Sequence, residues 1–189
     1  MNPPTGPATP RVFGLTGPNA AGKGEVAAYL AELGFAVHSL SDVVREEAAA
    51  RGLGAEREHL IRIGNELRAA GGPGILARRI LPRLGRRDVV DSIRNPAEVE
   101  VLREVEGFAL VGVTAKVETR FARSLARARP GDPRTLAAFE SRECEENSAD
   151  PARQRLAATF DLADVVLNND GTLADLRAAV DSLIAGPGR

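Results

Sequence analysis

A glycine-rich segment near the N-terminus carries the clearest chemical signal in this sequence. Gly17 and Gly22 are separated by four residues, and Lys23 follows the second glycine directly. A short β-rich run precedes the segment and a helical apolar pattern follows it. The glycines let successive backbone N–H groups surround a phosphate, the helix start adds a positive dipole, and Lys23 is suited to catalysis because it reaches nucleotide β- and γ-oxygens. The residues predicted to bind a phosphorylated donor are Gly17, Asn19, Ala20, Ala21, Gly22, Lys23, Gly24 and Glu25.

The residue after the lysine is a glycine, where loops of this kind usually carry Ser or Thr. Without that hydroxyl at Gly24, Mg²⁺ must be held by nucleotide oxygens, water and a carboxylate from elsewhere in the chain. Asp91 is the predicted metal carboxylate, because it ends an apolar run that would lie beside the loop; a turn or capping role is the alternative. We expect Glu25 to point to solvent, since the first turn of a helix favours an acid.

Short apolar runs alternate with helical patterns along the rest of the chain. Strands separated by helices in this way predict an α/β fold with a five-stranded parallel sheet and helices on both faces. Ligands of such sheets bind beyond the carboxyl ends of the strands, which is where the candidate residues fall. The predicted strands are residues 12–16, 35–40, 88–92, 108–114 and 165–167.

The helix boundaries have their own signals. Ser41 is a predicted N-cap, and Asn95 and Glu98 match a capping box with a proline at the first helical position. Asp132 is expected to start a helix that ends near residue 146. Residues 55–84 read as mostly helical, with a break at 71–74.

Composition limits the classes of partner. The chain has 189 residues and a formal net charge of −1, which argues against a dedicated nucleic-acid binder. No apolar run reaches the ~18–20 residues that cross a bilayer, so no membrane partner is expected. A single cysteine, Cys144, is typical of a reducing, cytoplasmic setting. We expect a disordered tail at residues 1–10 and one domain over residues 11–185.

Two segments resemble known kinases. Residues 14–24, with the Lys23-Gly24 ending, resemble the P-loop of small-molecule kinases in its adenylate-kinase form, and residues 163–172 resemble the closing strand and turn of dephospho-CoA kinases. Residues 11–184 as a whole are similar to dephospho-CoA-kinase-like proteins, including the kinase-like segment of some deoxycytidylate deaminases. The resemblance implies a three-layer P-loop NTPase fold that uses ATP and Mg²⁺.

Two further segments, residues 39–45 and 91–94, resemble the acceptor-phosphate segments of nucleoside monophosphate kinases. The resemblance implies an acceptor-binding region at residues 41–84 in which Arg45 and Arg94 grip the acceptor phosphate; Arg94 is also assigned to catalysis. The planar fork of arginine suits that task, although a surface ion pair is the alternative for each. The predicted acceptor-binding residues are Ser39, Ser41, Asp42, Arg45, Arg68, Arg94 and Arg142.

Six arginines lie between residues 120 and 142, where the resemblance implies a mobile lid over residues 120–148. Arg123 and Arg127 are four apart and share a helix face; Arg123 is expected to contact the donor and Arg127 to be catalytic, with a solvated face as the alternative. The turn containing Asn169 and Gly171 is expected to approach adenine through its backbone, which would leave its side chains replaceable.

These features predict an ATP-dependent phosphotransferase acting on a small nucleotide, working as a monomer or homodimer. A (deoxy)nucleoside monophosphate acceptor is already anionic and needs no base. A hydroxyl acceptor, as in dephospho-CoA, needs one, and Asp42 is then the candidate; a helix-start acid is its alternative role. A third possibility is a regulator that binds ATP or a dNTP without transfer, which Gly24 and Glu25 favour.

Overall fold

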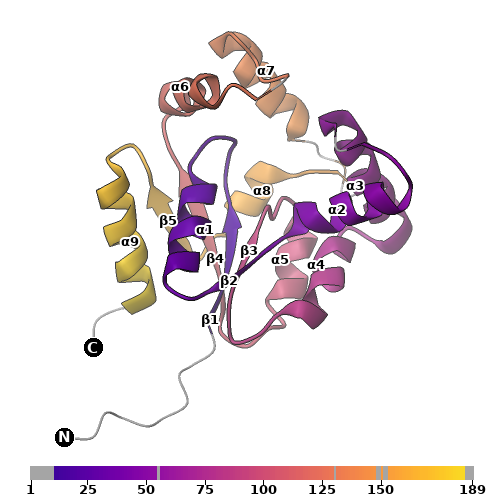
Figure 1. The fold of residues 1–189 in the computed structure, drawn as a ribbon, viewed down its shortest axis with the longest axis horizontal. Coiled ribbons are helices and arrows are strands. Elements are labelled where there is room, and N and C mark those ends of the chain that lie inside the picture. Colours follow the sequence, from indigo (N-terminus) through magenta and orange to yellow (C-terminus); the bar gives the residue numbers. More distant parts are fainter. Residues whose placement is uncertain (1–10, 55, 130, 148–149, 151–152, 186–189) are drawn as a thin grey trace, which may run out of the picture.

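A central parallel sheet organises the computed structural model, which describes residues 11–54, 56–129, 131–147, 150 and 153–185. Its strand order is β2-β3-β1-β4-β5, and every neighbouring pair is parallel, as predicted (Figure 1). The expected tail at residues 1–10 and the last residue of the expected lid lie outside the described residues. The strands are β1 (Arg11–Thr16), β2 (Ala36–Ser39), β3 (Arg87–Asp91), β4 (Phe108–Thr114) and β5 (Val165–Asn168).

Helices cover both faces of the sheet, because consecutive strand residues point to opposite faces and both faces are apolar. Phe13 and Val89 face a cluster completed by α1 and α9, whereas Val12 and Val90 face a cluster completed by α2, α3, α4 and α5. None of the helices in the described part of the chain is long and apolar enough to cross a membrane. The helices are α1 (Lys23–Glu32), α2 (Leu40–Ala50), α3 (Arg57–Gly71), α4 (Ile75–Ile80), the 3₁₀ helix η1 (Leu81–Arg83), α5 (Pro96–Leu102), α6 (Val117–Arg127), α7 (Leu136–Glu146), α8 (Leu156–Phe160) and α9 (Leu173–Ala185).

Two helix starts differ from prediction. Ser39, not Ser41, is the N-cap of α2, and its hydroxyl accepts the Ser41 backbone N–H at 3.2 Å. The helix expected from Asp132 begins later, at Leu136, because the Asp132 carboxylate binds Ser124 and Arg127 instead of capping.

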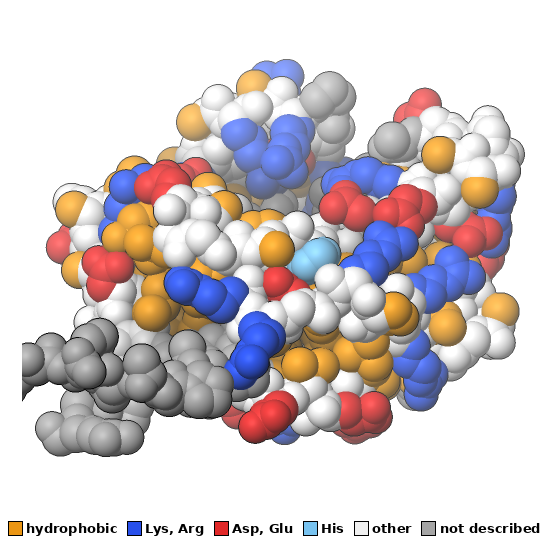
Figure 2. Space-filling view, turned by 60° about the horizontal axis from the view of Figure 1, so that its bottom comes forward, with side chains coloured by type: hydrophobic (Ala, Val, Ile, Leu, Met, Phe, Trp, Pro, Cys, Tyr) orange, Lys and Arg blue, Asp and Glu red, His pale blue; other side chains and the backbone are white. Residues whose placement is uncertain are grey.

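The helices α6 and α7 lie beyond the carboxyl ends of the strands (Figure 1). The rings of Phe121 and Phe139 pack at 5.8 Å and join the two helices to each other. The two apolar clusters that flank the sheet include no residue of α6 or α7 within the described ranges. Figure 2 shows Lys and Arg side chains gathered on the lobe at the top, which is where Figure 1 places these helices.

Candidate functional site

The loop between β1 and α1 requires glycine at two positions, Gly17 and Gly22. Gly17 has φ +131° and a Cβ there would overlap the carbonyl of Val113, so no other residue fits. Gly22 caps α1 at φ +108°. The Lys23 ammonium donates to the carbonyls of Gly17 (2.6 Å) and Pro18 (2.9 Å) and so lies across the loop.

Positive charge accumulates around Lys23. Burial lowers the pKa of its ammonium from the usual 10.5 to about 8, and the guanidinium of Arg94 adds to the decrease, while the carboxylate of Asp91 opposes it. A bound polyanion would relieve this repulsion, because opposite charge favours the protonated form. The electrostatics at Lys23 therefore suit a phosphate ligand.

A cavity of about 710 Å³ opens in front of the loop, and we call it the donor cavity. Gly17 and Ala21 support the loop without lining the cavity, and Gly171 also lies outside it. Glu25 is exposed, as expected, but it borders the cavity. The lining residues are Asn19, Ala20, Gly22, Lys23, Gly24, Glu25, Asp91, Arg94, Arg123, Arg127, Arg129, Asn169, Leu173 and Leu176.

Asp91 offers the donor cavity a carboxylate oxygen with unused capacity. Its Oδ2 accepts from Ser92 (3.2 Å), while its buried Oδ1 has no partner among the described residues. No group of three or more His, Cys, Asp or Glu side chains suited to a metal occurs in the described ranges. A Mg²⁺ ion would fit beside Asp91 only with most of its ligands supplied by phosphates and water.

The side chain of Asn169 has a structural role that contradicts the expectation of a replaceable residue. It is buried, and its Nδ2 donates to the carbonyl of Ala21 at 2.9 Å. Its backbone carbonyl accepts from Arg123 at 2.9 Å. Asn169 thus links the phosphate loop, the turn after β5 and helix α6.

A second cavity of about 580 Å³ lies between α2, α3 and the end of β3, and we call it the acceptor cavity. Of the predicted acceptor-binding residues, Ser41, Arg45, Arg68 and Arg94 line it. The other lining residues are Leu40, Val44, Glu56, Leu60, Ile61, Gly64, Leu76, Ser92, Arg129, Asp132 and Gln154.

Three predicted acceptor contacts lie outside the acceptor cavity. Ser39 is occupied in capping α2 and in a 3.3 Å hydrogen bond to Ser92. Asp42 forms an exposed ion pair with Arg45 at 2.5 Å. Arg142 donates to the carbonyl of Gly131 at 2.6 Å, within the region of α6 and α7. Their assignment to acceptor binding remains a prediction from sequence similarity.

The chain is similar in sequence to several known proteins. Residues 16–140 match the family model of an AAA domain. A UPF0200 protein of Halobacterium salinarum is 37% identical over 185 residues, which cover 93% of each chain. The chain belongs to the UPF0200 family. Another UPF0200 protein, from Hyperthermus butylicus, is 31% identical and matches 90% of this chain and 91% of its own.

Solved structures show how this UPF0200 protein is built. TT1252 from Thermus thermophilus superposes with a TM-score of 0.63 at 24% identity, covering 94% of this chain and 97% of that one. Shikimate kinase from Bacteroides thetaiotaomicron superposes with a TM-score of 0.59 at 15% identity, covering 93% and 97%. The UPF0200 chain therefore has a P-loop kinase fold.

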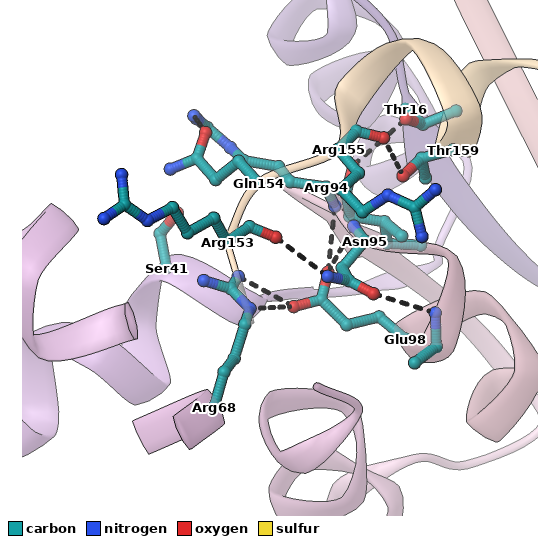
Figure 3. Close-up of polar contacts among 12 residues, drawn as sticks. Thr16, Ser41, Arg68, Arg94, Asn95, Glu98, Arg153, Gln154, Arg155 and Thr159 are labelled. Carbon is teal, nitrogen blue, oxygen red and sulfur yellow. Dashed lines mark hydrogen bonds and ion pairs between the residues drawn. The ribbon is translucent and has the colours of Figure 1, made fainter. Parts of the chain in front are cut away.

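Within the UPF0200 site, Arg68 does not present a free charge to the acceptor cavity. Its guanidinium donates twice to Glu98, at 3.1 and 2.8 Å, and both side chains are buried (Figure 3). The other oxygen of Glu98 accepts the backbone N–H groups of Arg94 (2.9 Å) and Asn95 (3.1 Å). Arg68 thus braces the turn that holds Arg94, and its role as a phosphate contact remains a prediction.

Gln154 and Arg129 are among the residues that line the UPF0200 site and received no individual predicted role. Gln154 accepts from the Arg94 guanidinium at 3.0 Å (Figure 3). Arg129 lies among the arginines of the expected lid, and it lines both cavities. Arginine density pointed to the region of Arg129, but no sequence signal marked Gln154.

Proposed function

We propose that this UPF0200 protein transfers the γ-phosphoryl group of ATP to the phosphate of a (deoxy)nucleoside monophosphate or a related phosphorylated nucleotide. The observation that carries the proposal is the meeting of two cavities at Arg94, which lines both. One cavity has the P-loop at its base, and the wall of the other combines arginines with both apolar and polar side chains. A donor and an acceptor bound in them would meet at this arginine.

The donor cavity suits ATP. The phosphate loop and Lys23 are preorganised toward the β- and γ-phosphates, and Leu173, half exposed at the cavity wall, offers apolar surface to a base. Asp91 would hold Mg²⁺ indirectly, through water. When bound, that ion would neutralise charge on the donor phosphates.

The acceptor cavity favours a phosphate acceptor over a hydroxyl. Asp42, the candidate base, lies outside it. Of the carboxylates in its described lining, Asp132 binds Arg127 and Ser124, and Glu56 binds His59. An anionic phosphate oxygen needs no base: it forms a bond to the γ-phosphorus as the bond to the β-phosphate oxygen breaks, and ADP leaves with that electron pair. This arrangement supports the monophosphate acceptor over dephospho-CoA.

A non-catalytic nucleotide-binding regulator is the second candidate. Gly24 and Glu25 favour it, because the loop lacks the hydroxyl that usually binds Mg²⁺ and an exposed acid adds negative charge at the border of the donor cavity, where transfer needs positive charge. Such a protein would bind ATP or a dNTP without releasing ADP.

The test is a panel of nucleoside and deoxynucleoside monophosphates and dephospho-CoA, each incubated with ATP and Mg²⁺ while ADP and new phosphorylated products are measured. We expect transfer to at least one monophosphate, lost by about 100-fold or more in Lys23→Ala. Arg94→Ala should lower kcat and raise KM for the acceptor. Transfer to dephospho-CoA alone contradicts the proposed acceptor, and ATP binding without ADP release selects the regulator.

A further inference from the structure

We infer that Arg129 is a catalytic residue that contacts the phosphoryl group as it passes between the two cavities. Of the described residues, only Arg94 and Arg129 line both cavities. A side chain at this junction can touch donor and acceptor phosphates at once. The inference rests on the proposed function, which supplies the two ligands.

Two arginines of α6, the helix that precedes Arg129, are already engaged in holding the phosphate loop. Arg127, the residue assigned to catalysis from the sequence, donates to Asp132 and to the Asn19 side chain, each at 3.1 Å. Arg120 donates to the Asn19 carbonyl at 3.3 Å and forms an ion pair with Glu143. These arginines act as positioning residues, and the catalytic assignment moves from Arg127 to Arg129.

Arg123 is engaged only in part: its Nη2 donates to the carbonyl of Asn169, while its buried Nη1 has no partner among the described residues. By contrast, the guanidinium of Arg129 is exposed and forms no hydrogen bond or ion pair within the described part of the chain. An arginine without a carboxylate partner keeps its full charge and all five donors for a ligand. Arg129 is therefore the member of this group whose whole guanidinium is available and which also lines the acceptor cavity, whereas Arg123 lines the donor cavity alone.

The backbone at the end of α6 sets the position of Arg129. Ala128 adopts the left-handed conformation (φ 47°, ψ 43°), which ends the helix immediately before Arg129. The Arg129 carbonyl then accepts the Asp132 N–H at 3.1 Å, and the Asp132 carboxylate binds Arg127. The turn that presents Arg129 is thus fastened to the same arginine that grips the phosphate loop.

The charge of Arg129 falls where phosphoryl transfer needs it. In the transition state, negative charge spreads over the equatorial oxygens of the transferred group, between the attacking and leaving oxygens. Lys23 would contact the transferred group from the phosphate loop, and Arg94 would contact it from the turn after β3. Arg129 adds a planar guanidinium from the side of α6, which would complete a three-sided electrostatic clamp.

The test compares Arg129→Ala and Arg129→Lys with Arg134→Ala, an exposed arginine of the same loop that lines neither cavity. Two quantities are measured: kcat for transfer, and the ratio of the Kd values for ATP and adenosine 5′-tetraphosphate, whose fourth phosphate extends from the donor cavity toward the acceptor. Binding needs no known acceptor, so this second quantity is independent of transfer.

We expect Arg129→Ala to lower kcat by about 100-fold or more while the Kd for ATP changes by less than about threefold. The wild type should bind the tetraphosphate about tenfold tighter than ATP, and Arg129→Ala should abolish that difference. The kcat and the Kd ratio of Arg129→Lys should lie between those of the wild type and Arg129→Ala. Both quantities should be unchanged from the wild type in Arg134→Ala. An unchanged Kd ratio in Arg129→Ala overturns the inference, whereas a wild type that binds ATP but transfers to no acceptor overturns only the proposed function.

Discussion

The side-chain amide of Asn169 donates to the backbone carbonyl of Ala21 at 2.9 Å, which fastens the turn after β5 to the phosphate loop after β1. The two residues are 148 positions apart and both are buried. The geometry of the loop therefore depends on a residue far away in the sequence, and not only on its own glycines.

Removing this hydrogen bond should destabilise the protein and weaken its nucleotide site together. Asn169→Ala leaves the buried Ala21 carbonyl unpaired, so the free energy of unfolding should fall by about 1–3 kcal/mol. Asn169→Asp should cost at least as much, because a carboxylate cannot donate to a carbonyl. Denaturant unfolding and ATP titration measure both effects, and a fully stable Asn169→Ala with unchanged ATP affinity would contradict this role.

Two alanine substitutions distinguish a glycine that is required for steric reasons from one that is not. Gly22→Ala places a Cβ against the Asn169 amide at φ +108°, so it should cost about 1–3 kcal/mol in unfolding free energy and abolish ATP binding. Gly24→Ala is the matched control: no atom lies within 4 Å of its Cβ, and alanine favours a helix by up to ~1 kcal/mol. Equal losses in both variants would argue against the steric explanation.

ATP binding should take up a proton above pH 8. The pKa of Lys23 is lowered to about 8 in the free protein, and bound phosphates favour the charged form and raise it again. At pH 8.5 the binding enthalpy should therefore depend on the ionisation enthalpy of the buffer, and Lys23→Met should remove that dependence. For folding, the unfolded chain binds more protons between pH 8 and 10.5, so this group makes unfolding less favourable as pH rises through that window.

Asp91→Asn should separate metal-dependent from metal-independent binding. The substitution keeps the size of the side chain but removes the charge that, in the proposed site, would face a water on Mg²⁺. We expect Mg²⁺-dependent transfer to fall by about 10–100-fold, while the Kd of metal-free ATP changes by less than about threefold. Tight Mg²⁺ binding without nucleotide, measured by calorimetry, would show that the protein supplies more ligands than Asp91 offers.

Local patterns predicted much of the fold and part of the site. The apolar runs predicted the parallel sheet, and Asn95 and Glu98 form the expected capping box. The sequence did not show that Glu98 also neutralises Arg68, because that contact joins helices 30 residues apart. The hydrogen bond of Asn169 was not predicted for the same reason: a contact between residues far apart in the sequence produces no local sequence pattern.

The cap of α2 shows a different limit. Ser39 and Ser41 have the same chemistry, and the choice between them depends on where β2 ends, which is the least certain feature of a strand pattern. The choice decides which hydroxyl faces the acceptor cavity: Ser41 lines it because Ser39 is occupied with the cap.

The strand β1, which leads into the phosphate loop, and the helices α6 and α7 differ in how they are held in the fold. β1 is hydrogen-bonded to β3 on one side and β4 on the other. In contrast, α6 and α7 add nothing, in the described chain, to the two apolar clusters. In amide hydrogen exchange we therefore expect β1 to exchange only through global unfolding and α6 and α7 through local opening. The loop that holds the donor and the arginines that act on it would then belong to separate cooperative units.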